Sequence, residues 1–248
     1  MRQIKNQAAA LTALAALGVL ASCSNDDSQA QTDPSPTDGG AATGTTPDPG
    51  YTIVAETHLD GPGRWAMRAA GDPEAPLAVI DVPKGYQARE SYVWTHDELD
   101  LDDYPGQLLY RAPTRVYADP CDVDRPSPRL GPTVEDLAEA LAAQKRTTTT
   151  RPVATELGGY RGLYLELSTP DALGSEPCAP KGGMLIFDAG PDDGERVLEV
   201  AATDRYWILD IEGRRVVVSA MTPAGARSES VERVTDVAEG VTFIDAAP

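Results

Sequence analysis

Short apolar segments, separated by turn residues, dominate the chain from residue 51 onward. Most are rich in β-branched or aromatic side chains and are flanked by Gly or Pro, which is typical of strands. The predicted strands are Tyr51–Thr57, Trp65–Ala70, Leu77–Val82, Tyr92–Thr95, Val116–Ala118, Gly162–Thr169, Met184–Asp188, Arg196–Ala202, Tyr206–Ile211 and Arg214–Met221, with Val153–Leu157 as a weaker candidate and Val241–Ile244 as a final short strand.

Two other segments repeat their apolar residues at helical spacing. In the first, Thr133 is the expected N-cap, because Asp136 follows three residues later as the acidic partner of a capping box. Its apolar face consists of Val134, Leu137, Ala138 and Leu141. The second helix is expected to have Ser228 as its cap and to end at Gly240. Its stripe consists of Val231, Val234, Val237 and Ala238, whose valines lower the intrinsic propensity, so packing must stabilise it.

The clearest hairpin joins Tyr206–Ile211 to Arg214–Ala220 through Glu212-Gly213, because Gly can adopt positive φ in a tight turn. With the strands and helices above, this pattern predicts an α+β fold: a mostly antiparallel sheet packed with two helices, after a disordered tether. No second linker comparable to the N-terminal one interrupts residues 51–248, so we expect a single globular domain there.

The N-terminus has the pattern of an export signal. Arg2 and Lys5 precede an apolar run, Ala8–Leu20, that is too short for an ordinary membrane span of about 20 residues. Leu20-Ala21-Ser22-Cys23 then resembles a bacterial lipobox. The resemblance implies that residues 1–22 are a lipoprotein signal peptide, cleaved between Ser22 and Cys23, and that Cys23 carries a diacylglyceryl thioether. The alternative is a plain secretory signal that leaves Cys23 as an ordinary thiol.

The expected location is therefore the extracytoplasmic face of the cell membrane, with the lipid on Cys23 as anchor. Residues 24–50 are rich in Ser, Thr, Asp, Gly, Pro and Ala, with no large apolar residue and no basic residue. Such a segment cannot bury enough apolar surface to offset its ordering entropy. We expect residues 23–50 to be a lipidated cysteine followed by a disordered linker.

The charge balance excludes one class of partner. Removing residues 1–22 takes away two basic residues and leaves 19 basic against 39 acidic ones, a net charge of −20. Nucleic acids are bound through Lys and Arg contacts to phosphates, so this composition argues against a nucleic-acid partner.

Three cysteines occur in the chain. With Cys23 assigned to the lipid, Cys121 and Cys178 remain as an even pair in an exported protein, which predicts a disulfide. A redox pair or a metal site is the alternative. No Cys-x-x-Cys occurs, and the spacing of the cysteines and histidines matches no zinc motif.

No catalytic motif is recognisable. His58 and His96 are the two histidines of the chain, and Gly-x-Ser-x-Gly, His-Glu-x-x-His, P-loop and dinucleotide glycine patterns are absent from the sequence. An acidic run, 97–103, and the group Asp119, Asp122 and Asp124 could ligate calcium, but solvated loops are the favoured interpretation. We therefore assign no catalytic residue, cofactor or metal, and an enzyme is disfavoured.

Aromatic residues cluster more suggestively. Six of the 14 in the chain fall within 32 positions: Tyr86, Tyr92, Trp94, Tyr104, Tyr110 and Tyr117. Such rings could line an apolar cleft for a lipid or a glycan, although core packing is the commoner use. Trp207 and Tyr206 are assigned to the core of the hairpin.

Longer stretches support a family resemblance. Trp207-Ile208-Leu209-Asp210 and 213–218, followed by the second helix and Val241-Thr242-Phe243, resemble the C-terminal part of uncharacterised actinobacterial exported lipoproteins. Segments 115–121 and 131–138 are similar to other parts of that group. Segment 81–86 and the terminal order strand, strand, helix resemble PsbP-like domains in fold.

Three functions remain open. The first is a non-enzymatic binding or accessory lipoprotein of the cell envelope that contacts an envelope protein, a lipid or a glycan. The others are an envelope hydrolase that uses dispersed carboxylates and a structural surface protein.

Overall fold

The structure is a computed structural model that describes residues 50–54, 59–95, 106–122, 124, 129–173, 178, 183–190 and 194–245. The chain divides into two units, residues 1–46 and 47–248, and the described residues all belong to the second. The predicted signal peptide, Ser22, Cys23 and nearly all of the predicted linker lie outside the described residues. Among the described helices, none is long and apolar enough to cross a membrane.

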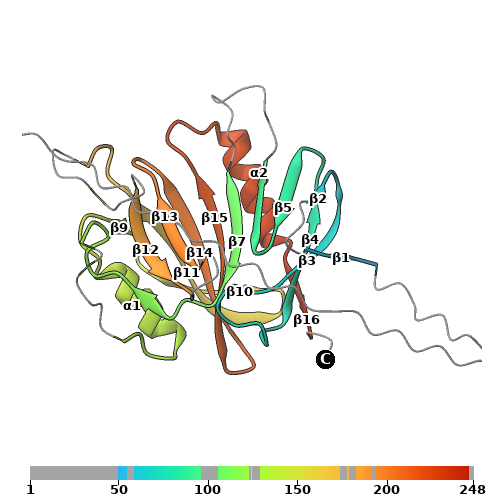
Figure 1. The fold of residues 1–248 in the computed structure, drawn as a ribbon, viewed down its shortest axis with the longest axis horizontal. Coiled ribbons are helices and arrows are strands. Elements are labelled where there is room, and N and C mark those ends of the chain that lie inside the picture. The colour runs from blue at the N-terminus through green and yellow to red at the C-terminus, as the bar shows by residue number, and fades with distance from the viewer. Residues whose placement is uncertain are drawn as a thin grey trace, which may run out of the picture. The chain divides into compact units, whose positions relative to one another are not determined.

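A nine-stranded antiparallel sheet forms the centre of the described part (Figure 1). Its order is β10-β11-β14-β15-β7-β6-β5-β2, with β9 paired to β11 at one end. The strands are β2 (Leu59–Asp60), β5 (Tyr86–Arg89), β6 (Tyr92–Thr95), β7 (Gln107–Arg111), β9 (Thr148–Thr149), β10 (Val153–Leu157), β11 (Tyr160–Ser168), β14 (Thr203–Ile211) and β15 (Arg214–Thr222).

Two smaller sheets and two helices complete the described elements. One sheet has the order β1-β3-β4-β16 and contains one parallel pair, β1 with β3; the other has the order β13-β12-β8. Their bounds are β1 (Thr52–Ile53), β3 (Gly63–Met67), β4 (Leu77–Val82), β16 (Thr242–Ile244), β8 (Arg115–Val116), β12 (Met184–Asp188) and β13 (Glu195–Leu198). The helices are α1 (Val134–Ala142) and α2 (Ser228–Glu239). The predicted fold class is confirmed.

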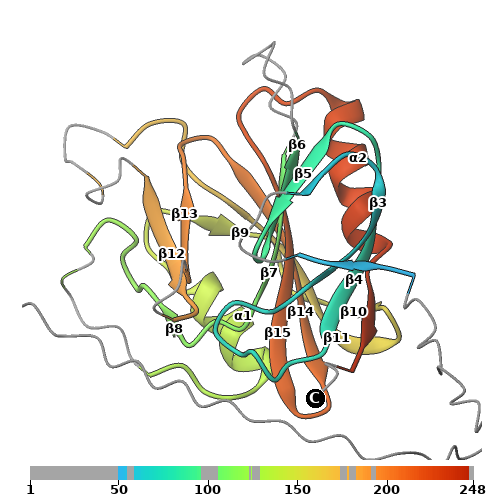
Figure 2. The same cartoon turned by 45° about the vertical axis from the view of Figure 1, so that its right-hand side comes forward.

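Alternation along β14 divides the core between the two faces of the large sheet. Trp207, Leu209 and Ile211 pack in an apolar cluster with α2 and the four-stranded sheet, and we call this side the apolar face. Tyr206 and Ile208 pack in a second cluster with α1 and the three-stranded sheet. The second side also holds a buried ion pair and is called the charged face. Figure 2 shows the two covering layers on opposite sides of β14 and β15.

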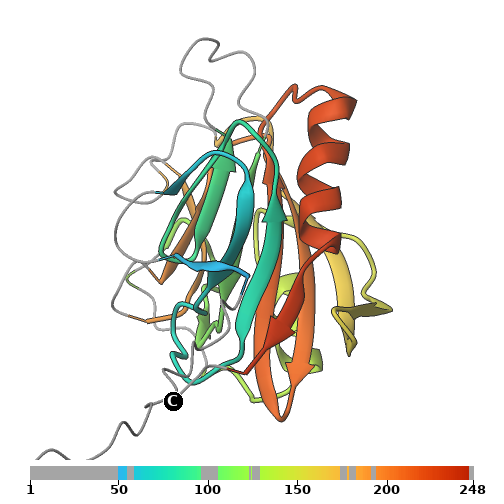
Figure 3. The ribbon, with the colours of Figure 1, turned by 90° about the vertical axis from the view of Figure 1, so that its right-hand side faces the viewer.

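The helices follow the predicted pattern, with one correction. Thr133 caps α1: its hydroxyl accepts from the Asp136 N–H at 3.1 Å, while its own N–H donates to the Asp136 carboxylate at 2.8 Å. The prediction that Ser228 caps the second helix was wrong, because Ser228 is the first helical residue and the cap is Arg227, without a side-chain capping bond. Gly240 ends α2 as predicted. Figure 3 shows α2 lying along the sheet and leading into β16.

The predicted hairpin is confirmed as β14 and β15, the longest strands together with β11. Glu212 and Gly213 both adopt positive φ, 55° and 81°, which suits a two-residue turn between twisted antiparallel strands. The Gly213 N–H donates to the Asp210 carboxylate at 2.8 Å and fixes the turn.

Four strands of the large sheet were not predicted: β2, β5, β7 and β9. The most consequential is β7, which pairs with β15 near the middle of the sheet. Its residues Gln107 and Arg111 interrupt the apolar pattern, yet Arg111 is fully buried. The strand was missed because Gln107 and Arg111 look like loop residues in the sequence, whereas in the fold they donate to or accept from groups of the three-stranded sheet.

The predicted disulfide is present. Cys121, which follows β8, is bonded to Cys178, which precedes β12, and their Cα atoms are 4.3 Å apart. Cys121 and Cys178 both pack in the cluster under the charged face. The bond therefore links the segment between β8 and α1 to the segment that precedes β12.

Candidate functional site

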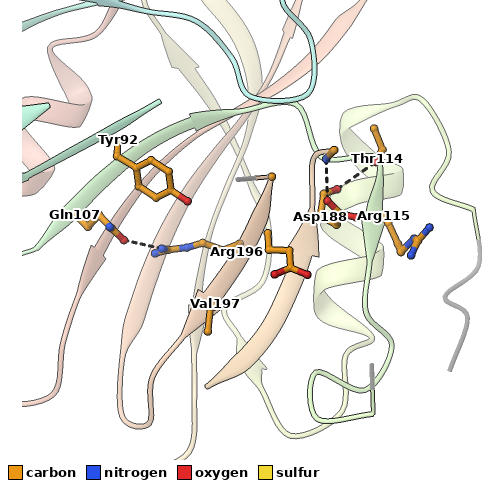
Figure 4. A pocket seen from close by; sticks show the side chains of 10 residues that line it. Tyr92, Gln107, Thr114, Arg115, Asp188, Arg196 and Val197 are labelled. Atoms are coloured by element: carbon orange, nitrogen blue, oxygen red, sulfur yellow. Dashed lines mark hydrogen bonds between the residues drawn. The ribbon is translucent and has the colours of Figure 1, made fainter. Parts of the chain in front are cut away.

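A pocket of about 860 Å³ opens where the three-stranded sheet meets β6 and β7 (Figure 4). The large sheet contributes Tyr92 and Gln107, and the smaller sheet contributes Arg115, Asp188, Glu195 and Arg196. Thr114, Val197 and two glycines complete the wall. We call this site the polar pocket, because Tyr92 and Val197 are the two described lining residues with aromatic or aliphatic side chains.

The alternation of side chains along β7 determines which of its residues face the pocket. Leu108 and Tyr110 point into the apolar cluster, so Gln107, Leu109 and Arg111 occupy the opposite side of the strand. Tyr92 lies opposite Leu109 in the neighbouring strand and shares that side. Burial of Leu108 and Tyr110 in the apolar cluster therefore places the polar residues of β7 on the side of the strand that faces the pocket.

A buried ion pair supports the pocket from behind. Arg196 of β13 donates through Nε to the Asp204 carboxylate of β14 at 2.7 Å, and the two side chains are 3% and 0% exposed. Burial acts to lower the pKa of Arg196, but Asp204 and Tyr206 together outweigh it and raise the pKa. The neighbouring Tyr206 hydroxyl has a pKa raised by burial and by the same carboxylate.

The ion pair continues into the pocket wall. Arg196 also donates, through Nη1, to the side-chain oxygen of Gln107 at 2.8 Å (Figure 4). Asp204, Arg196 and Gln107 therefore form a hydrogen-bonded chain across three strands, β14, β13 and β7. Desolvating two charges costs several kcal/mol per ion, so only well-aligned partners make such an arrangement tolerable. The chain gives the wall a fixed geometry.

A second buried arginine fixes the adjacent wall. Arg111 is fully buried, and its Nη1 donates to the Glu195 carbonyl oxygen at 3.2 Å. Its guanidinium carbon lies 4.5 Å from the centre of the Tyr92 ring, which is a cation–π contact. Arg111 thus links the start of β13 to the aromatic ring that lines the pocket.

Two carboxylates face each other across the smaller sheet. Asp188 and Glu195 are directly paired in the β12–β13 register. The Asp188 carboxylate accepts from the Gly190 N–H at 2.8 Å. A Cβ on Gly194 would lie 2.3 Å from Gly190, so the connection between the strands approaches itself too closely for any side chain there. Directly opposed like charges destabilise a sheet, so this pair adds no stability to β12–β13.

The chemistry available in the polar pocket is hydrogen bonding. Guanidinium and amide groups supply donors, while carboxylates and a hydroxyl supply acceptors, and the buried chain behind them limits their movement. Within the described residues, no group of three or more His, Cys, Asp or Glu side chains is placed to hold a metal ion.

The predicted aromatic group is dispersed by the fold. Tyr92 lines the polar pocket, whereas Tyr86 and Tyr110 are buried in the apolar cluster. Tyr110 donates to the Pro76 carbonyl oxygen at 2.8 Å, and its pKa is raised mainly by burial. Tyr117 is buried, Trp94 is half-buried, and Tyr104 lies outside the described residues.

The other predicted site residues separate into two groups. His58, His96 and the acidic run 97–103 lie outside the described residues, as Cys23 does. Asp119 accepts from the Cys121 N–H at 3.1 Å and forms an ion pair with Arg146 at 3.2 Å. Its carboxylate therefore supports the loop that carries the disulfide.

Sequence reasoning missed the residues that line the pocket or support its wall: Gln107, Arg111, Asp188, Glu195, Arg196 and Asp204. One signal could have found part of this set. In Gln107-Leu108-Leu109-Tyr110-Arg111, polar residues take one parity of an apolar segment, as expected of a strand with a polar side. The ion pair between Arg196 and Asp204 depends on the packing of two layers and leaves no mark in the sequence.

A different cavity, of about 590 Å³, lies beside the start of α1 and includes Arg215. The Arg215 guanidinium donates to the backbone carbonyls of Pro113, at 2.6 Å, and Gly131. Burial lowers the pKa of Arg215. Because these carbonyls accept from both terminal nitrogens of the guanidinium, Arg215 holds two loops against the hairpin.

The chain matches no protein-family model and no curated protein sequence. The solved structures that resemble it weakly include the following two. LpqN of Mycobacterium tuberculosis, described as involved in cell envelope biogenesis, has 13% identity and a TM-score of 0.37, over 75% of this chain and 91% of that chain. Cyanobacterial PsbP (CyanoP) from Synechocystis sp. PCC 6803 has 12% identity and a TM-score of 0.34, over 75% of this chain and 94% of that chain.

Proposed function

We propose that this protein is a non-enzymatic binding module of the cell envelope, which holds a small polar ligand in the polar pocket. The observation that carries the proposal is the buried chain from Asp204 through Arg196 to Gln107. Burying these charged and polar groups costs folding stability but fixes the position of the polar wall. A preformed binding site requires such a fixed wall.

The anchor belongs to the same proposal. Cys23 carries the lipid, residues 24–50 act as a flexible tether, and the domain stands outside the membrane. The lipobox-like tetrapeptide supports this location, and so does the disulfide, because disulfides persist in oxidising, exported compartments. Two or more acyl chains give stable anchoring, as one chain binds only marginally.

Native mass spectrometry of the full mature protein, purified from its host membranes, tests the binding function. Wild-type protein is expected to carry a retained small molecule, and Gln107→Glu is expected to lose it. The matched control is Gln87→Glu, the same substitution on β5 at a residue outside the pocket wall. Repeated recovery of empty wild-type protein, with a purified cell-wall extract also failing to add mass, would overturn the binding function.

Metabolic labelling with a palmitate analogue tests the anchor separately. The wild-type protein is expected to be labelled and membrane-bound, and Cys23→Ala is expected to be unlabelled. An unlabelled wild-type protein that is freely secreted would contradict the lipoprotein assignment and leave the pocket unaffected.

An envelope hydrolase is the second candidate, and one observation favours it. Asp188 and Glu195 are opposed carboxylates at the wall of one pocket, the arrangement that acid–base or nucleophilic hydrolysis uses. Time-dependent cleavage of cell-wall glycan by wild-type protein, abolished in Glu195→Gln, would replace the binding module with this function. Intact glycan after prolonged incubation would remove it.

A further inference from the structure

We infer that the ligand of the polar pocket is a neutral oligosaccharide, recognised through a side-chain amide that the protein locks as a hydrogen-bond donor. This inference rests on the proposed binding function and deepens it. It follows from the orientation of Gln107, the balance of charges around the pocket, and the scarcity of apolar lining.

The orientation of Gln107 is set by chemistry. A guanidinium can only donate hydrogen bonds, so the Gln107 atom that meets Arg196 Nη1 at 2.8 Å must be the amide oxygen. Arg196 is itself held by Asp204 at 2.7 Å and cannot rotate away without breaking a buried ion pair. The amide nitrogen of Gln107, with its two N–H groups, is then the part left to address a ligand. It requires an oxygen acceptor.

The hydrogen-bond chain also strengthens that donor. Asp204 polarises the Arg196 guanidinium, which in turn draws electron density from the amide oxygen of Gln107. Chains of hydrogen bonds in a low-dielectric interior reinforce one another in this way. Gln107 therefore offers a neutral donor of fixed direction to an uncharged acceptor such as a hydroxyl, a ring oxygen or an acetamido carbonyl.

The charges around the site cancel among the described residues. Three cations and three anions line or support the pocket: Arg111, Arg115, Arg196, Asp188, Glu195 and Asp204. A free anion would meet two lining carboxylates and a chain of net charge −18, and a free cation would meet the arginines. A ligand without charge avoids both penalties. Its own groups must donate to the carboxylates and accept from the amide, which every sugar hydroxyl can do.

The remaining features distinguish a sugar from a lipid. An acyl chain needs an apolar wall, and Tyr92 and Val197 are the two apolar contributions among the lining residues that the structure describes. Tyr92 is held by its contact with Arg111, and a rigid ring of this kind packs against the C–H face of a sugar. A volume of about 860 Å³ lies in the upper part of the range for small-molecule sites and leaves room for more than one sugar unit.

Isothermal titration calorimetry on the full chain tests the inference. The chain carries Cys23→Ser so that it is free of lipid, and the neutral probes are tetra-N-acetylchitotetraose, maltotetraose and mannotetraose. The competing classes are acetate and inorganic phosphate as anions, lysine amide as a cation and decanoate as a lipid. At least one oligosaccharide is expected to bind. Gln107→Glu keeps an oxygen toward Arg196 but presents an acceptor to the ligand, so we expect at least about tenfold weaker binding, roughly 1.4 kcal/mol.

Two further variants make the result decisive. Gln87→Glu adds the same charge to β5 and is expected to bind as the wild type does. Tyr92→Ala removes the ring without touching the Gln107–Arg196 bond and is expected to weaken binding, which keeps the test valid if Gln107→Glu unfolds. Near-ultraviolet circular dichroism checks the fold of each variant.

The outcomes separate the ligand class from the function. If an anion, a cation or decanoate binds, the oligosaccharides do not, and Gln107→Glu abolishes that binding, the sugar assignment is wrong and the binding module stands. If an oligosaccharide binds equally to wild type, Gln107→Glu and Tyr92→Ala, the site lies elsewhere and the inference fails. If no probe binds and native mass spectrometry finds empty protein, both proposals fail together.

Discussion

The two faces of the nine-stranded sheet are stabilised in different ways. On the apolar face, α2 and the four-stranded sheet cover a continuous cluster that includes Trp207, Leu209 and Val234. On the charged face, α1 and the three-stranded sheet cover a second apolar cluster, and a buried ion pair, a disulfide and a capped helix add to this packing. The polar pocket opens at the edge of the second cover. Both faces therefore bury apolar surface, and the charged face adds a buried ion pair and the polar pocket.

This difference shows how a small domain can tolerate a site that lowers its stability. Apolar burial contributes in proportion to area and needs no exact partner. A buried ion pair contributes little net stability, but removing one partner lowers the free energy of unfolding strongly, because the other charge is left buried and unpaired. Substitutions in the ion pair of the charged face should therefore have effects that depend on the partner, whereas substitutions on the apolar face should depend on the volume removed.

Removing one partner of the ion pair should give the largest effect. Asp204→Ala leaves the Arg196 charge buried without its carboxylate, so we expect the free energy of unfolding to fall by about 3–5 kcal/mol. Urea denaturation measures this change. The double variant Arg196→Met with Asp204→Leu should recover most of the loss, because it removes both charges together.

The matched substitution on the apolar face is Leu209→Ala, which should cost about 2–5 kcal/mol through lost burial and a cavity. Adding Val218→Ala to it should deepen the loss. If the double variant of the ion pair were as unstable as Asp204→Ala alone, the contrast between partner-dependent and volume-dependent stability would be broken.

Removing the disulfide should weaken the cover of the charged face. The bond spans 57 positions, and the chain-entropy relation gives a loss of about 4 kcal/mol for the double variant Cys121→Ala with Cys178→Ala. Urea denaturation with and without reductant provides the measurement, and reductant should affect the wild type alone. Alkylation of both cysteines in unreduced, denatured wild-type protein would show that the bond is absent.

Alkaline pH should unfold both faces, because each buries a tyrosine. Burial raises the pKa of Tyr110 and of Tyr206 above the ordinary value of 10.0. The neutral hydroxyl is favoured in the folded state, so this stability is fully present below pH 10 and is lost as pH rises toward the folded pKa. Each tyrosine should then cost about 1.4 kcal/mol per pH unit.

Tyr110→Phe separates the contributions of the two faces. The variant loses the bond to the Pro76 carbonyl, about 0.5–1.5 kcal/mol at neutral pH, but its stability should fall less steeply between pH 10 and 11 than that of the wild type. Denaturation at pH 8, 10 and 11 provides the comparison. Equal slopes for the two proteins would mean that Tyr110 ionises in the folded state as readily as in the unfolded state.

The helix caps should give the smallest effect and the finest contrast. Thr133→Ala removes the side-chain cap of α1 and should lower stability by about 1 kcal/mol. Ser228→Ala, at the exposed start of α2, removes no capping bond and should change stability by less than about 0.5 kcal/mol. Thermal unfolding monitored by circular dichroism measures both. Similar losses would show that α2 also depends on a polar start.

The sequence predicted the elements whose signals are local. The capping box at Thr133 and the turn at Glu212-Gly213 depend on residues within a few positions of one another, and both are present in the fold. It failed where the environment is created by other layers. Gln107 and Arg111 interrupt the apolar pattern because they meet Arg196 and Tyr92, which the chain brings to them from elsewhere. The pocket is formed by such contacts, so little of it was predictable.

The hairpin of β14 and β15 has a further consequence for folding. It lies between β11 on one side and β7 on the other, although both of those strands precede it in the chain. Arg214 of the hairpin, for example, pairs with Asp72, 142 positions earlier. Loop-closure entropy must be overcome before contacts of this range form, so such topologies fold slowly. The two halves of the sheet are joined only when the hairpin, which comes late in the chain, pairs with both of them. A chain truncated at residue 202 should therefore have two separate sets of strands with unpaired edges, which favour aggregation.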